Sequence, residues 1–239
     1  MEWFVQITGD NFDLEELSKS LQSPQVCIIR EEQGFFLKST DFNFLNDTKD
    51  VKRTALELLS LINGSARLTL GMRKPLEMAH IIRINDDKTR HIFIEISDTV
   101  NIRASTTILT VTKDGTSKEI RQSDIITNWL SIAKRDSNVA KVLRLFGIGT
   151  HDWISLYRVF EVIEEDVGGV SNIKKQGWAA EKAIKRFKHT ANSPHILGDI
   201  ARHGVEKTEP PKDPMSLSEA RSFIEGIIHN WLRSKSSSK

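Results

Sequence analysis

The segment from residue 187 to residue 204, FKHTANSPHILGDIARHG, contains three of the chain's seven histidines. In this segment His203 has the chemistry of a general base, and the adjacent Arg202 could stabilise negative charge in a transition state. Asp199 lies three residues before Arg202 and four before His203, so a helix over residues 197–204 would place all three on one face. They are therefore the candidate catalytic residues. The alternative is that they only satisfy backbone groups at helix ends.

The candidate binding residues come from the helix expected just before this segment. Between residues 174 and 188 there are six basic residues and one acidic residue, Glu181. A basic helix face suits the phosphates of nucleic acid or of a nucleotide. The alternative is that these charges attract the acidic end of the preceding helix, EVIEEDV, and are used within the fold. The candidates are Lys185, Arg186, Lys188, His189 and Asn192.

The sequence does not favour a metal site or a cofactor site. His189, His195 and His203 lack the close spacing to an acid that zinc-binding helices show, and Cys27 is the single cysteine. Neither standard glycine-rich phosphate loop is present. No serine has the flanking glycines of the strand-to-helix turn that carries the nucleophile in many hydrolases. We therefore expect neither a metal nor a cofactor.

The overall composition is that of an ordinary globular protein. The 239 residues carry a formal net charge of +2, with 38% hydrophobic and 28% charged residues, so the chain as a whole is too balanced to indicate a polyanion partner. A single cysteine is typical of a reducing compartment. The N-terminus lacks the features of a signal peptide, and no stretch of about 18 apolar residues could span a membrane. We expect a cytoplasmic protein without membrane contact.

The first half of the chain predicts an α+β region with a mainly antiparallel sheet and two helices. Helices are expected over residues 13–22 and 48–63, the second ended by Asn63 and Gly64. The period of apolar residues then changes to two, and turn residues separate the segments, which favours antiparallel strands. The expected strands are residues 3–8, two within 25–40, 66–71, 78–84, 90–97 and 101–112.

The second half predicts an all-helical bundle. Apolar residues recur at helical spacing, and Ser216 with Glu219 fits a capping box at the start of the last helix. We therefore divide the chain into an α+β domain, residues 1–122, and a helical domain, residues 123–235. Helical segments are expected within residues 123–135, 138–147, 151–169, 178–192 and 216–234.

Four segments of the helical half, LYRVFEVIEEDVGG, GWAAEKAIKRFKHTAN, GDIARHG and PPKDPMSLSEARSFIEGIIHNWL, together resemble a group of uncharacterised bacterial proteins. The helical arrangement is also similar to HEPN-type domains, which are common in bacterial defence and toxin–antitoxin systems. The resemblance implies a helical module and, for catalytic members, a metal-independent ribonuclease.

The signature of those catalytic members is an arginine, four to six further residues, and then a histidine. Arg202 and His203 are adjacent and therefore depart from it, and Arg186 is too close to His189. The spacing does occur from Arg73 to His80 and from Arg144 to His151.

Two functions follow as hypotheses. The first is a non-enzymatic intracellular bacterial protein whose C-terminal helical module binds a protein partner or assembles, with a homodimer through the helical domain as one expected form. The second is a metal-independent ribonuclease, or a component of a defence or toxin–antitoxin system that binds RNA or a nucleotide. In the second, Lys185, Arg186 and Lys188 would hold phosphates, while Arg202 and His203 would carry the chemistry.

Overall fold

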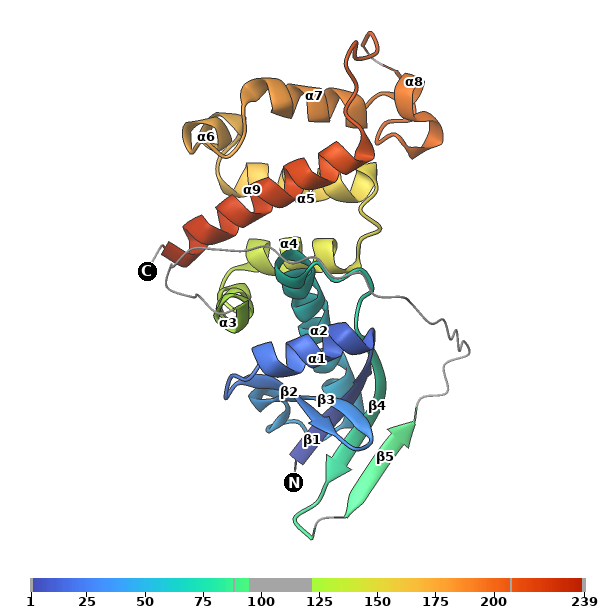
Figure 1. Cartoon of the computed structure of the whole chain (residues 1–239), viewed down its shortest axis with the longest axis vertical. Coiled ribbons are helices and arrows are strands. Elements are labelled where there is room, and N and C mark those ends of the chain that lie inside the picture. The colour runs from blue at the N-terminus through green and yellow to red at the C-terminus, as the bar shows by residue number, and fades with distance from the viewer. Residues whose placement is uncertain (1, 88, 95–121, 207, 238–239) are drawn as a thin grey trace.

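A computed structural model describes residues 2–87, 89–94, 122–206 and 208–237 (Figure 1). It confirms the α+β class, with an antiparallel sheet in the N-terminal region and helices in the C-terminal region. The expected strand over residues 101–112 lies outside the described residues. The N-terminal elements are β1 (Glu2–Thr8), α1 (Asn11–Ser20), β2 (Val26–Glu31), β3 (Gly34–Ser39), η1 (Thr40–Phe42), α2 (Thr48–Leu70), β4 (Glu77–Ile84) and β5 (Arg90–Ile94).

The described strands form a sheet of order β2-β3-β1-β4-β5 in which all neighbours are antiparallel. β1 lies in the middle because α1 and α2 each connect strands that are not neighbours, which is the split β-α-β arrangement. The alternating side chains give the sheet two different faces. Val5 and Leu37 face α1 and α2 in a large core, whereas Phe4, Phe36 and Ile82 form a small cluster on the opposite face.

The second helix is longer than the sequence indicates. Asn63 and Gly64 were expected to end it, but α2 continues to Leu70, so the strand expected over residues 66–71 is wrong. Gly64 is buried where α2 crosses α4, and this close packing keeps it within the helix. The helix ends at Gly71, which has a left-handed φ of 68° and donates its N–H to the carbonyl of Arg67.

The C-terminal region is helical, as expected, and its helices stack above the sheet in the view of Figure 1. The long helix α9 packs against α5 and α3. Its capping box is confirmed, because the N–H of Ser216 bonds Glu219 and the N–H of Glu219 bonds the Ser216 hydroxyl. The elements are α3 (Gln122–Ala133), α4 (Ser137–Ile148), α5 (Trp153–Asp166), α6 (Val170–Lys175), α7 (Glu181–Ala191), α8 (Pro194–Leu197), η2 (Gly198–Ile200) and α9 (Leu217–Ser237).

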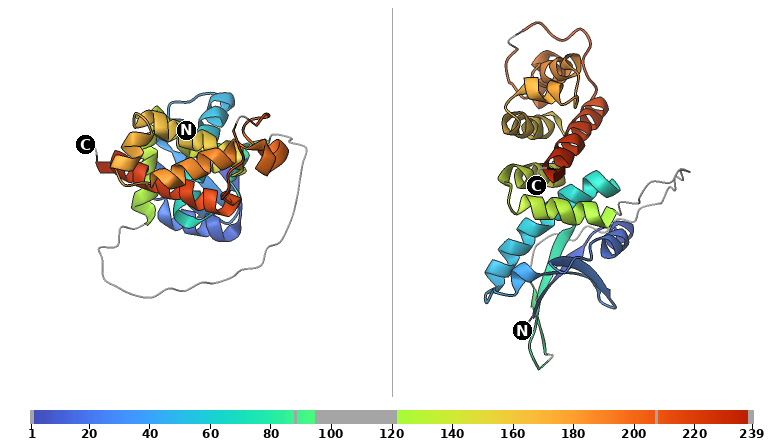
Figure 2. Two further views of the ribbon diagram at one scale, coloured as in Figure 1. Left: turned by 90° about the horizontal axis from the view of Figure 1, so that it is seen from above. Right: turned by 90° about the vertical axis from the view of Figure 1, so that its left-hand side faces the viewer.

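The two regions meet where α2 crosses α4, between the sheet and the stacked helices (Figure 2, right). A Cβ atom on Gly64 would lie within 3 Å of the Leu143 backbone, and one on Gly147 would lie 2.6 Å from the nitrogen of Gly64. Only glycine permits so close a crossing. The helix α3 also joins the regions, because Leu130 belongs to the core under the sheet and Trp129 to the core among the helices.

Candidate functional site

The segment between α7 and α9 does not form the expected helix over residues 197–204. It contains the single turn of α8 and the short η2, which ends at Ala201 in an extended conformation. Gly198 breaks the helix with a φ of 59°, and the N–H of Arg202 donates to the carbonyl of Ala191, so the chain folds back against the end of α7. The prediction that Asp199, Arg202 and His203 share one helix face is therefore wrong.

Arg202 nevertheless is the centre of a polar cluster. One Nη donates to Glu161 of α5 over 2.6 Å, and the guanidinium lies 4.2 Å from the centre of the Tyr157 ring. The other Nη donates to the side-chain oxygen of Asn192 at 3.5 Å and to Nε2 of His203 at 3.1 Å. We call Tyr157, Glu161, Asn192, Arg202 and His203 the Arg202 cluster. One residue of the candidate binding set, Asn192, thus contacts one of the candidate catalytic set, Arg202, and Glu161 and Tyr157 of α5 join them.

The chemistry of the Arg202 cluster is limited by its pairings. Arginine is a donor only, so Nε2 of His203 is the acceptor in the hydrogen bond between the two side chains. Glu161 compensates the charge of Arg202, which leaves less of that charge for a substrate anion. Asp199 is exposed and, among the described residues, has no hydrogen-bond or ion-pair partner, so it does not orient His203.

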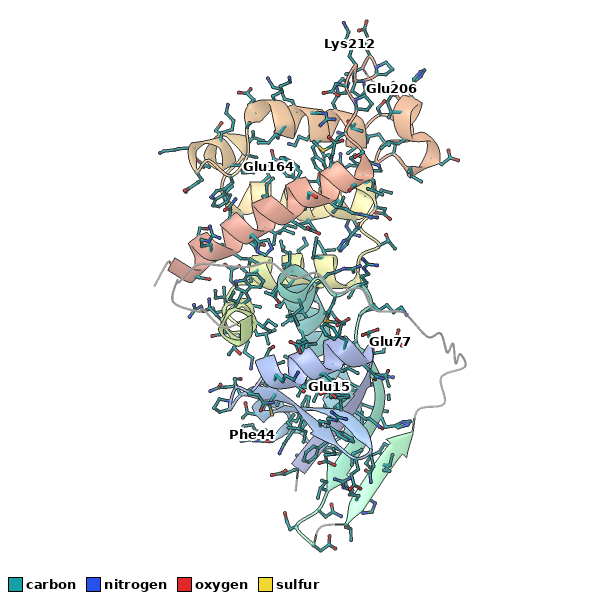
Figure 3. The ribbon with its side chains drawn as sticks, viewed as in Figure 1. Glu15, Phe44, Glu77, Glu164, Glu206 and Lys212 are labelled. Atoms are coloured by element: carbon teal, nitrogen blue, oxygen red, sulfur yellow. The ribbon has the colours of Figure 1, made fainter. Side chains whose placement is uncertain are left out.

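Three basic residues of α7, Lys185, Arg186 and Lys188, are paired within the fold. Lys188 contacts both oxygens of Glu164 on α5 at 2.7 Å, so the basic helix does attract the acidic end of the helix before it (Figure 3, where Glu164 is labelled). Lys185 pairs with Glu181 at 2.9 Å. Hydrogen bonds from Lys174 and Lys185 lower the pKa of Glu181 to about 2.

Arg186 and His189 bind the connector that leads to α9. Arg186 pairs with Glu219 at 3.0 Å and donates to the carbonyls of Asp213 and Pro214. Hydrogen bonds from Ser216 and Arg186 lower the pKa of Glu219 to about 2. A ring nitrogen of His189 lies 2.7 Å from the carbonyl of Glu209. These contacts are structural, and they leave few free donors on this helix for phosphates.

Another connector residue, Glu206, completes the turn at the start of α8, beside which it is labelled in Figure 3. Its carboxylate accepts from the Ser193 hydroxyl at 2.8 Å and from the N–H of His195 at 2.9 Å. These hydrogen bonds lower the pKa of Glu206. Glu206 therefore caps the break that Pro194 introduces after α7.

A shallow hollow of about 260 Å³ lies between α4 and α5. Leu145 and Val162 provide its apolar part. Glu161 lines it and also belongs to the Arg202 cluster, so the two features share one edge. The sequence carried a signal for it, because the charged residues Arg158, Glu161 and Glu165 of α5 recur at helical spacing. We call it the α4–α5 hollow; its lining residues are Asn138, Lys141, Leu145, Arg158, Glu161, Val162 and Glu165.

Several charged residues of this hollow are unpaired within the described structure, in contrast to Lys185, Arg186 and Lys188 of α7. Within the described part of the chain, Lys141, Arg158 and Glu165 have no ion-pair or hydrogen-bond partner. Lys141, Arg158 and Glu165 are exposed, and they include both signs of charge. A polar, solvent-accessible rim around apolar side chains is typical of a protein-binding surface.

The arginine–histidine pairs with the spacing of the ribonuclease signature share no hydrogen bond in the described part of the chain. Arg144 is exposed on α4, whereas His151 is buried and its ring bonds the carbonyl of Phe146 at 2.8 Å. His80 lies on β4, and Arg73 is in the connection before that strand. Among the described residues, no three or more His, Cys, Asp or Glu side chains form a group that could hold a metal ion.

In the ranges that the structure describes, none of the helices combines the length and the apolar character needed to cross a membrane. Comparison of the chain with models of protein families, with curated proteins and with solved structures gives no match.

Proposed function

We propose that the C-terminal helical region is a non-catalytic module that binds a protein partner through the α4–α5 hollow. The observation that supports this most is the set of unpaired charges of both signs, Lys141, Arg158 and Glu165, around Leu145 and Val162. A protein surface can complement both signs and cover the apolar side chains. The homodimer expected through this region is one form that such binding can take, and we place it in the cytoplasm because the single cysteine suits a reducing compartment.

RNA suits this surface less well. Glu161 and Glu165 would repel phosphates at the hollow, whereas specific nucleic-acid interfaces are strongly positive. On α7, phosphates would have to displace carboxylates, because Lys188 already pairs with Glu164. Catalysis by His203 would need a free cation beside it, and Arg202 is compensated by Glu161.

The proposal can be tested with a photo-crosslinking amino acid placed at Leu145 in the full chain, in living cells. We expect a protein adduct that is sensitive to protease and that disappears when Arg158→Glu is added. The matched control places the same amino acid at Lys182, an exposed position on α7, where we expect no adduct. Equal adducts at both positions, none at Leu145, or an adduct removed by ribonuclease would contradict the proposal.

A second measurement addresses nucleic acid directly. Fluorescence anisotropy with a labelled single-stranded RNA of about 20 nucleotides should show no binding in the micromolar range at physiological salt, where nonspecific binders reach about 10⁻⁴ to 10⁻⁶ M. Neither the wild type nor His203→Ala should cleave the same RNA. Cleavage that His203→Ala abolishes would replace the proposed function with the ribonuclease.

A further inference from the structure

Two arginines from distant parts of the chain meet at the link between α4 and α5, residues 149–152. Arg67, in the last turn of α2, donates from one Nη to the carbonyl of Gly149 at 3.3 Å. Arg221, near the start of α9, donates from Nε to the carbonyl of His151 at 3.0 Å. The two accepting carbonyls are two residues apart, so both guanidinium groups lie beside the same short link.

Neither of these guanidinium groups has a carboxylate partner. Arg67 and Arg221 are both half-buried, and among the described residues neither forms an ion pair. The other Nη of Arg67 donates to the carbonyl of Arg73 at 3.3 Å, whereas the two Nη groups of Arg221 donate to nothing in the described part of the chain. By contrast, Arg186 and Arg202 each pair with a glutamate.

The two charges are also close enough to disfavour each other. Burial lowers the pKa of Arg67, and the charge of Arg221 lowers it further. The acid that opposes this effect is Glu225, one turn further along α9, but within the described structure it makes no ion pair with either arginine. Charges that are partly removed from water without a direct counter-charge cost free energy, and a bound anion would recover it.

The connection from α2 to β4 adds positive charge at this place. The hydrogen bond from Arg67 to the carbonyl of Arg73 holds this connection beside the junction. The side chains of Arg73 and Lys74 are exposed, and neither has an ion-pair partner in the ranges that the structure describes. Such exposed cations do not form a site alone, but they raise the local concentration of anions near the two arginines.

A phosphate group matches this arrangement. The planar guanidinium of arginine binds phosphate oxygens through pairs of N–H groups, and Arg221 has both of its Nη groups available in the described structure. A phosphate dianion also balances the charges of Arg67 and Arg221 together, whereas one carboxylate balances only one of them. Because the cations gather at a single junction with Glu225 beside them, the site suits one phosphate group better than a long polyanion.

We propose that Arg67 and Arg221 bind one phosphate group of a small anion beside the link between α4 and α5. The bound phosphate would join α2 of the N-terminal region to α9 of the C-terminal region. This inference is independent of the proposed function, because the site shares no residue with the lining of the α4–α5 hollow.

The site is tested by isothermal titration calorimetry of the full chain with inorganic phosphate, in a chloride buffer of low ionic strength. We expect one phosphate per chain with a dissociation constant below about 1 mM. Arg221→Gln keeps an N–H donor but removes the charge, and it should weaken binding at least tenfold. Glu225→Gln removes the nearby negative charge and should strengthen binding severalfold, which is a gain that a poorly folded variant cannot show.

The matched control is Arg135→Gln on α3. Arg135 is exposed and has no ion-pair partner in the described part of the chain, so it represents an ordinary surface arginine. Its replacement should leave the affinity for phosphate unchanged. Circular dichroism melts confirm that each variant is folded. A parallel titration with a nucleoside monophosphate identifies the source of the phosphate: binding at least tenfold tighter than that of inorganic phosphate assigns a phosphate ester, and equal binding assigns the free ion.

The histidine of the link locates the bound anion. Burial lowers the pKa of His151, and the charges of Arg67 and Arg221 lower it further, while Asp152 opposes them. Phosphate at the proposed site should therefore raise the pKa of His151 in an NMR titration, with the signal assigned by its loss in His151→Asn. Absence of saturable binding, equal weakening by Arg221→Gln and Arg135→Gln, or an unchanged His151 pKa with phosphate bound would each overturn the proposal.

Discussion

Arg202 and Glu161 are joined by a hydrogen bond of 2.6 Å, which ties the segment after α8 to the middle of α5. The guanidinium also covers the ring of Tyr157. The arginine that drew attention as a catalytic candidate therefore has a clear structural role. The roles of His203 and Asp199 in any chemistry remain predictions that the cleavage assay tests.

Replacing Arg202 by alanine should destabilise the protein by about 1 to 2 kcal/mol, the sum of a partly exposed ion pair and a contact of a cation with an aromatic ring. Urea unfolding followed by circular dichroism measures this. Asp199→Ala, on the same segment but without a partner in the described structure, should change the free energy of unfolding by less than about 0.5 kcal/mol. If both variants lose the same free energy of unfolding, the contacts of Arg202 do not stabilise the fold.

Gly64→Ala should be strongly destabilising. The added Cβ would lie 2.1 Å from the carbonyl oxygen of Leu143, which is backbone and can move only if α2 and α4 separate. We expect a loss of about 3 kcal/mol, at the upper end of the range for overpacked cores. The control is Gly226→Ala in α9, where a Cβ meets no atom within 4 Å and the change should stabilise by up to about 1 kcal/mol. A Gly64→Ala variant as stable as the control would contradict the tight crossing.

Two histidines should make the protein less stable in mild acid. Burial lowers the pKa of His151 below its ordinary 6.5, and the charges of Arg67 and Arg221 lower it further. Burial likewise lowers the pKa of His229 on α9. The unfolded chain then binds protons near pH 6.5 that the folded chain does not bind, so the free energy of unfolding falls as the pH drops below 6.5.

Urea unfolding at pH 7.5 and pH 5.5 measures this loss. The double variant His151→Asn, His229→Gln should lose less stability between the two values than the wild type. Asparagine is chosen at position 151 because it tolerates the φ of 54° found there. The control His195→Gln, at an exposed position, should keep the pH dependence of the wild type. If the double variant loses as much stability between pH 7.5 and pH 5.5 as the wild type, His151 and His229 are not the cause of the acid sensitivity.

Lys235 should stabilise the end of α9 at neutral pH and not in strong acid. Its Nζ contacts Asp136 and Asp166, both at 2.8 Å. Burial alone would raise the pKa of each carboxyl, but hydrogen bonds, above all from Lys235, lower both pKa values below 3.8. The stabilisation is therefore present above pH 3.8 and is lost as the pH falls through the lowered pKa values.

Lys235→Met should lower the free energy of unfolding by about 1 to 3 kcal/mol at pH 7, because two partly buried carboxylates lose their shared cation. Thermal unfolding at pH 7 and pH 2.5 should show this difference from the wild type becoming smaller in acid. Trp231 provides a local fluorescence probe, since its indole N–H donates to Asp166 at 2.8 Å. If Lys235→Met destabilises the protein equally at both pH values, its effect does not come from the ion pairs with Asp136 and Asp166.

The helices were largely predictable because their buried residues recur at helical spacing. Trp153, Phe160 and Ile163 of α5 are all buried, as the pattern indicates. The end of α2 was not predictable, because a glycine that usually ends a helix is here required by a neighbour 79 positions away in the chain, Leu143. Helix-ending rules that use only neighbouring residues in the sequence cannot predict such a contact.

The site was less predictable than the fold for the same physical reason. The sequence brought Arg202 and His203 together only because they are adjacent. The partner of Arg202, Glu161, is 41 residues away, and its position depends on how α5 packs beside the folded-back segment. The hollow likewise depends on which faces of α4 and α5 meet. Charge spacing along α5 indicates an exposed stripe, and only the packing shows that it borders an apolar depression.

The crossing of α2 over α4 also bears on whether recombination could separate the two regions of this chain during evolution. The expected boundary between residues 122 and 123 separates two compositions, yet a Cβ atom added to Gly147 after it would lie 2.6 Å from the backbone nitrogen of Gly64 before it. Recombination at that boundary would give each half a new neighbour without the matching glycine. A gene fusion that borrowed only one half would therefore expose a groove shaped for the other, so the two regions should be passed on together as one unit.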